Sequence, residues 1–201
     1  MQLPQGYQGI IRQVEAYRPW DRQEAADREN LLRYLRQFDD LLGRENPLAH
    51  LTASSWIVDP SRTQVLMVYH NIYDSWSWTG GHADGDADLL AVAMREAQEE
   101  TGVPVRPVRP ALYGLEILPV PAHEKRGKQL SAHLHLNLTY LLEADPSVPL
   151  RKKPDENRAG AWFEKEAAVR ASSEPEMRPV YARLNAKLSR EMDPEDEFFR
   201  G

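Results

Sequence analysis

The stretch from Gly80 to Val103, GGHADGDADLLAVAMREAQEETGV, concentrates more ionisable chemistry in a short length than any other part of this 201-residue chain. Its local signals predict a helix from about Asp88 to Thr101. Asp86 and Asp88 can cap the first turn, where free N–H groups and the positive end of the helix dipole favour carboxylates. Gly102 suits the left-handed residue that ends many helices.

Acidic side chains gather on one side of this predicted helix. Arg95, Glu96 and Glu99 share the charged side, with Glu100 at its border. Glu96 is three and four positions from the other two glutamates, so their like charges repel by roughly a few tenths of a kcal/mol per pair. A divalent cation would turn this repulsion into attraction, because hard oxygen ligands suit Mg²⁺, Mn²⁺ or Ca²⁺. Taken alone, the pattern also fits a surface helix with a charged wet face.

The spacing of the whole segment resembles the Nudix box, G-x(5)-E-x(7)-R-E-U-x-E-E-x-G-U, in which U is a bulky apolar residue. The chain departs from it at two positions: the isolated early glutamate falls on Ala87, and the apolar position after R-E is the small Ala97. The positions that match are Gly81, Arg95, Glu96, Glu99, Glu100, Gly102 and Val103.

The resemblance implies a Nudix-type α/β/α sandwich with a mixed sheet, and a metal-dependent pyrophosphohydrolase. Members of the family cleave the diphosphate linkage of a nucleoside diphosphate derivative or a related organic diphosphate. The implied cofactor is Mg²⁺ or Mn²⁺, which neutralises phosphate oxygens and activates water. By position, the metal ligands would be Glu96, Glu99, Glu100 and the backbone carbonyl of Gly81.

Two roles remain open within this resemblance. The general base is Glu96 or a loop glutamate outside the box, Glu124 or Glu156. Arg95, grouped with the catalytic glutamates, would brace the box loop through an ion pair. Because Ala87 replaces the usual partner of that arginine, we expect a neighbouring aspartate, Asp86 or Asp88, to take over.

Two other functions compete with hydrolysis of a diphosphate. A catalytically weak Nudix-fold protein could bind a nucleotide or metabolite as a regulator, and Ala87 favours this alternative while the retained glutamates oppose it. A Nudix-like isoprenoid diphosphate isomerase relies on a catalytic cysteine, and this chain has none. The sequence does not identify the leaving group, which is the moiety attached to the other end of the diphosphate.

Composition excludes several classes of protein. The net charge is -6 and no basic stripe is visible, which argues against binding of a nucleic-acid duplex. With no cysteine, disulfides and thiolate metal sites are excluded. No apolar run is long enough for a membrane span or signal peptide. The expectation is a cytoplasmic protein whose partner is a small-molecule diphosphate.

The chain divides into a helical extension over residues 1–48 and a Nudix domain over residues 49–201. Helical spacing predicts a first helix from Tyr7 to Tyr17 and a second from Asp21 to about Leu42. The apolar stripe of the second helix must pack against the same domain or against a second subunit. A homodimer is therefore one of the two expectations.

The opposite wall of the site is predicted from two later segments. The loop over residues 119–128 carries a basic patch that includes Arg126 and Lys128, and cations of this kind bind diphosphates. In the strand over residues 131–143, His133 and His135 lie on a polar face that could line a cleft. These histidines could bind metal, hydrogen-bond a phosphate or belong to an ordinary polar surface, and we assign them with the basic pair to substrate binding.

The remaining elements follow from periodicity and turn chemistry. Strands are predicted over residues 50–58 and 64–70, which form a hairpin across the turn Asp59-Pro60-Ser61-Arg62. Further predictions are one or two strands over 105–118, a short strand over 161–163, and helices over 165–171 and 178–191.

Overall fold

The computed structural model describes residues 6–125, 127–151, 153 and 157–191, without the side chains of residues 125, 128 and 191. The described residues fall into two compact units. The first lies within Met1–Ser54, Gly80–Val92 and Ala111–Tyr140, and the second within Ser55–Thr79, Ala93–Pro110 and Leu141–Gly201. No helix in the described part of the chain is long and apolar enough to cross a membrane.

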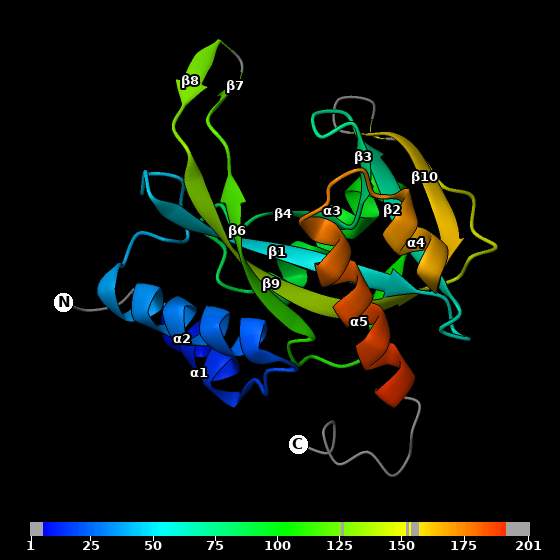
Figure 1. Ribbon diagram of the computed structural model, residues 1–201, viewed down its shortest axis with the longest axis horizontal. Helices are drawn as coiled ribbons and strands as arrows, with labels where there is room; N and C mark the ends of the chain where they lie inside the picture. Colours follow the sequence, from blue (N-terminus) through cyan, green and yellow to red (C-terminus); the bar gives the residue numbers. More distant parts are fainter. Residues whose placement is uncertain (1–5, 126, 152, 154–156, 192–201) are drawn as a thin grey trace. The chain divides into compact units, whose positions relative to one another are not determined.

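The described chain begins with two helices, continues with strands that are interrupted once by a helix, and ends with two further helices (Figure 1). The helices are α1 (Tyr7–Ala16), α2 (Arg22–Gln37), α3 (Leu89–Thr101), α4 (Lys165–Ala171) and α5 (Met177–Glu191). The strands are β1 (Ala49–Val58), β2 (Gln64–His70), β3 (Ser75–Ser77), β4 (Thr79–His82), β5 (Val105–Pro107), β6 (Gly114–Val120), β7 (His123–Lys125), β8 (Lys128–Leu130), β9 (His133–Ala144) and β10 (Asn157–Glu164). The main sheet follows the order β10-β2-β1-β9-β5, with β3 beside β2, β4 beside β1 and β6 beside β9.

In the first unit, helix α2 packs on strand β6 and helix α1 packs on α2. The apolar stripe of α2 is buried, with Leu31 and Leu35 at 1% and 0% exposure. The Tyr140 hydroxyl of β9 donates to the side chain of Gln13 in α1 (3.0 Å). The hydroxyl of Tyr17, the residue after α1, donates to the carboxylate of Glu24 in α2 (2.6 Å).

In the second unit, helix α4 packs on β10, β2 and β3, and α5 packs on α4. Strand β2 pairs antiparallel with β10 and with β3, so it is enclosed on both edges. The core includes Trp56 and Tyr181, both fully buried and stacked with ring centroids 5.2 Å apart. Aromatic pairs of this kind add to the free energy gained from burying their apolar area.

The prediction of a helix as far as Leu42 is wrong, because α2 ends at Gln37. Phe38 takes an extended conformation (φ -116°, ψ 140°), and the carbonyl of Leu41 accepts a hydrogen bond of 2.7 Å from the backbone of Leu51. The apolar residues after Phe38 are buried as expected, but their backbone pairs with the start of β1 instead of continuing the helix.

The prediction of an irregular loop over residues 119–128 is also wrong. Strand β6 continues to Val120, and β7 and β8 form an antiparallel hairpin in the same unit. Pro119 lies opposite Leu134 of β9. Proline is tolerated at strand positions where no N–H is needed for the ladder, so its presence did not break the strand.

Candidate active site

Helix α3 starts where its capping residues predict. The Asp88 carboxylate accepts a hydrogen bond from the backbone N–H of Ala91 (3.0 Å), and the Asp86 carboxylate accepts one from the N–H of Asp88 (2.9 Å). These bonds satisfy N–H groups that a helix start leaves without intrahelical partners. Both aspartates thus fix the entry to the box helix, and their predicted pairing with Arg95 stays a prediction.

The end of α3 requires a glycine. Gly102 has φ +71°, and its N–H donates to the carbonyl of Gln98 (2.8 Å). A Cβ atom at this position would lie 2.7 Å from the Cβ of Arg151. The segment that carries Arg151 therefore packs directly on the helix end, and its backbone N–H donates to the carbonyl of Thr101 (2.7 Å).

The three box glutamates have different environments. Glu100 is buried, at 4% exposure, whereas Glu96 is half-buried and Glu99 is exposed. The Glu99 carboxylate forms an ion pair with Lys153 (3.1 Å). Arg95, on the same helix, is exposed. The buried carboxylate has the highest cost of desolvation and therefore the strongest need for a compensating positive charge.

Two residues that were not predicted from the sequence, Asn157 and Lys153, contact this helix end. The Asn157 side-chain amide donates to the carbonyl of Glu100 (3.0 Å), and its side-chain oxygen accepts from the backbone of Lys153 (3.2 Å). Asn157 is fully buried. The last carbonyls of any helix need donors, so an amide residue after the helix was a general candidate. No local sequence signal pointed to Asn157 itself, because it lies 57 positions after Glu100 in the chain.

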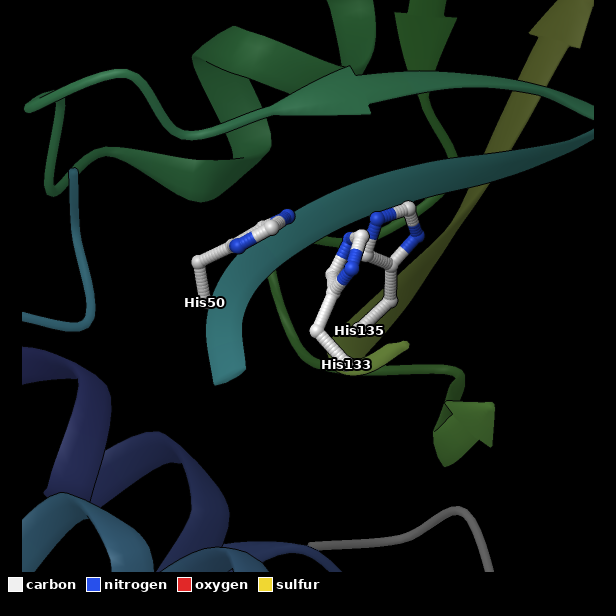
Figure 2. Close-up of side chains that lie close together, drawn as sticks. All are labelled: His50, His133 and His135. Atoms are coloured by element: carbon white, nitrogen blue, oxygen red, sulfur yellow. The ribbon is translucent and has the colours of Figure 1, made fainter. Parts of the chain in front are cut away.

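The donor atoms of the box glutamates fit a hard divalent cation by chemistry, since carboxylate oxygens are the ligands that Mg²⁺ and Mn²⁺ prefer. Their side chains do not converge, however. Among the described residues, the group of three potential ligands whose donor atoms lie within 4.8 Å of one another consists of His50, His133 and His135 (Figure 2).

The polar face of β9 is continuous with a buried network in the first unit. The hydroxyls of Thr52 and Ser54 donate to the side-chain oxygen of Asn137 (3.0 and 2.7 Å). The Asn137 amide donates to the Glu116 carboxylate (3.1 Å), which also accepts from the Thr139 hydroxyl (3.0 Å). All five residues are buried. Alternation along β9 predicted this polar face, but not the buried carboxylate of β6 that it surrounds.

The loop residues assigned to the opposite wall are placed only in part. Lys128 is the first residue of β8, and Arg126 lies outside the described residues. Of the alternative general bases, Glu124 is exposed on β7, and Glu156 lies outside the described residues. Gly81, the predicted carbonyl ligand, lies in β4 of the first unit.

Ala87, the departure from the box pattern, lies against Gly6, the residue that precedes the first helix. Gly6 precedes α1 with φ +86°, and a Cβ atom at Gly6 would lie 2.5 Å from the Cβ of Ala87. A glutamate at position 87 would need space close to this backbone. The small residue is therefore explained by packing within the first unit.

Known protein families and structures match the part of the chain that contains the box helix. A profile of the NUDIX domain matches residues 48–184. The m7GpppN-mRNA hydrolase NUDT17 of Xenopus laevis is 32% identical over 113 residues, which are 53% of this chain and 36% of that protein. The match thus spans about a third of that relative's length.

Two solved structures share the fold. An Ap4A hydrolase of C. elegans superposes with a TM-score of 0.51 at 19% identity, over 69% of this chain and 97% of the other. A NUDIX-family hydrolase of Clostridium perfringens superposes with a TM-score of 0.51 at 20% identity, over the same shares of the two chains. The expected α/β/α architecture with a mixed sheet is confirmed, and likeness at this identity shows the fold alone.

Proposed function

This chain belongs to the Nudix family of hydrolases, and on that basis we propose that it is a divalent-metal-dependent enzyme that cleaves the diphosphate linkage of a nucleoside diphosphate derivative. The observation that carries the proposal is the end of α3. Three glutamates occupy positions 96, 99 and 100 of one helix, and the turn at Gly102 anchors that end through two backbone hydrogen bonds.

Glu96, Glu99 and Glu100 would hold the metal ion, with the Gly81 carbonyl as a further ligand. When bound there, Mg²⁺ or Mn²⁺ would neutralise charge on the phosphate oxygens and make the attacking water more acidic. Burial of Glu100 makes it the principal ligand, since its carboxylate is largely shielded from water. Asn157 keeps the backbone at Glu100 in place through its hydrogen bond of 3.0 Å.

The reaction is attack by a water oxygen on one phosphorus atom of the diphosphate. A new phosphorus–oxygen bond forms, the bond to the bridging oxygen breaks, and the products are two compounds that each end in a phosphate group. The proton that water loses passes to a carboxylate, which we assign to Glu96. Its position on the same helix as the other glutamates supports this assignment over Glu124 and Glu156.

We assign phosphate binding to Arg126, Lys128, His133 and His135. Lysine and arginine carry positive charge at neutral pH, and imidazole N–H groups can donate to phosphate oxygens. The relative from Xenopus laevis, named as a hydrolase of m7GpppN-mRNA, supports a substrate with nucleosides on a phosphate chain. The diphosphate would then be attached to a nucleoside on at least one side.

We further propose that residues 1–48 form an extension of a Nudix domain that covers residues 49–201. The family match that begins at residue 48 supports this boundary. A homodimer is a separate prediction, which light scattering coupled to size-exclusion chromatography would test.

The test is hydrolysis of a panel of nucleoside diphosphate derivatives in Mg²⁺ or Mn²⁺, with products identified by mass spectrometry. Glu100→Gln should lower kcat at least about 100-fold, because the neutral amide is a poor ligand for a hard cation. Glu29→Gln, a change at an exposed position of α2, is the matched control and should keep full activity. Turnover of no panel member by the wild type, or full turnover by Glu100→Gln, would refute the proposal.

A further inference from the structure

Four histidines from three strands gather in the first unit. His50 of β1 has its ring centroid 4.9 Å from those of His133 and His135 of β9, and 4.8 Å from that of His82 of β4. His82 and His135 are also neighbours, at 4.9 Å. Figure 2 shows His50 reaching toward the two rings of β9 from a separate strand. The chain has six histidines, so four of them share one small region.

We propose that His50, His133 and His135 form a binding site for a divalent transition-metal cation such as Zn²⁺, with His82 beside it as a fourth imidazole. This site uses none of the box glutamates. It shares His133 and His135 with the proposed phosphate-binding residues, but its test is independent of turnover because Zn²⁺ binding is measured without substrate.

Ligand chemistry separates this site from the acidic helix. Imidazole nitrogen binds Zn²⁺, Cu²⁺ and Ni²⁺ well, whereas carboxylates suit Mg²⁺ and Mn²⁺. Three histidines with a fourth position open to water or another ligand are an established zinc arrangement. The two sets of ligands would therefore select different ions from the same solution.

The spacing of the donor atoms allows closure on an ion. One ring nitrogen from each of the three histidines lies within 4.8 Å of the others. Tetrahedral zinc with Zn–N bonds of about 2.0–2.1 Å requires nitrogens about 3.3–3.4 Å apart. Rotation of the half-buried His133 and His135 about their side-chain bonds can supply this difference, while His50 is held at 6% exposure.

The proton on His133 is placed as a metal ligand needs it. Its Nδ1 lies 2.8 Å from the carbonyl oxygen of Ser131. A carbonyl can only accept, so Nδ1 carries the hydrogen, and in the neutral form of the ring this leaves the lone pair on Nε2. Histidines that bind metals commonly donate their other ring N–H to a backbone carbonyl in this way, which fixes the tautomer and the ring orientation.

The experiment is calorimetric titration of the purified full chain with Zn²⁺, in the absence of substrate. We expect about one equivalent to bind and to raise the melting temperature, because a ligand bound only by the native state stabilises it. Co²⁺ substituted for Zn²⁺ should give the visible absorption of a tetrahedral site with nitrogen ligands.

The variants locate the site. His133→Gln and His135→Gln, each near the original in size, should weaken Zn²⁺ binding at least about 100-fold, because each removes a direct ligand. His70→Gln removes a histidine outside the cluster, and Glu100→Gln removes a box carboxylate, so both should bind as the wild type does. Far-ultraviolet circular dichroism of the metal-free variants checks that they are folded.

Several results would overturn the inference. These are the absence of Zn²⁺ binding by the wild type, unchanged binding by folded His133→Gln and His135→Gln, and loss of binding in Glu100→Gln. The last result would assign the ion to the acidic helix instead.

Discussion

The side-chain amide of Asn157 donates a hydrogen bond to the backbone carbonyl of Glu100 at a distance of 3.0 Å, and both groups are buried. The donor lies in a segment that the chain reaches 57 residues after the glutamate. The position of the most buried carboxylate of the candidate site therefore depends on a residue outside the box. Asn157 is a positioning residue, since it acts through the backbone of Glu100.

Replacing Asn157 by Ala should lower the free energy of unfolding by about 1–3 kcal/mol, because the buried carbonyl of Glu100 loses its donor. Urea denaturation measures this loss. A purely structural role would leave the folded enzyme unchanged, whereas a positioning role should raise the Mg²⁺ concentration needed for half-maximal activity. Gln8→Ala, at an exposed position of α1, is the control and should change neither quantity.

Lys153 competes with a metal ion for Glu99. Its ammonium lies 3.1 Å from the carboxylate, in a pair whose side chains are 25% and 47% exposed. Exposed pairs of this kind contribute about 0.2–1 kcal/mol, so Lys153→Gln should lower the half-saturating Mg²⁺ concentration by about 1.5- to 5-fold. Lys165→Gln on α4 should have no such effect. A higher requirement for Mg²⁺ in Lys153→Gln would show that the lysine supports the site instead.

Asp59 makes the hairpin turn between β1 and β2 sensitive to acid. Burial acts to raise its pKa, but hydrogen bonds from the Ser61 hydroxyl and from the backbone N–H groups of Gln64, Ser61 and Thr63 prevail, so the pKa lies below its usual value. A depressed carboxyl pKa stabilises the native state above the pKa of the unfolded chain, and this contribution is lost as pH falls.

Asp59→Asn should therefore lower the free energy of unfolding at pH 7 by about 1.5–3 kcal/mol, the range for hydrogen bonds to a charged group. The difference between variant and wild type should shrink as pH falls below about 4, where the unfolded carboxyl becomes protonated. Urea denaturation at a series of pH values gives both curves. Parallel curves down to pH 3 would contradict the assignment.

Ala87→Glu restores the residue type of the family pattern and should nevertheless destabilise this protein. Ala87 lies against Gly6, since a Cβ atom built on Gly6 would be only 2.5 Å from the Cβ of Ala87. Overpacking of this kind costs about 1–3 kcal/mol. Ala91→Glu makes the same change at an exposed position of α3 and is the matched control. Equal melting temperatures for the two variants would show that the N-terminal segment yields freely.

Features set by local chemistry were predicted well from the sequence. The box helix was expected over residues 88–101 and is found at Leu89–Thr101, because Asp88 caps it and Gly102 ends it within a few residues. Alternation gave the strand of His133 and His135 and its polar face. The turn at Asp59 followed from its own residues.

Features that depend on distant segments were not predicted. Lys153 and Asn157 reach the box helix only through the fold, and His50 and His82 join the β9 histidines across separate strands. Helix α2 was predicted too long because its apolar pattern continues past Phe38 while its backbone leaves the helix. Periodicity predicts which side chains are buried, but it does not predict which hydrogen-bond partner the backbone of those residues has.

The packing of α1 and α2 on the first unit has a practical consequence for recombinant fragments. The family match begins at residue 48, which would suggest trimming the chain there. Such a fragment would lose the buried faces that carry Ile10, Val14 and Leu35, and would expose the strand surface that they cover. We expect it to aggregate on expression, so fragments for crystallisation should start before α1.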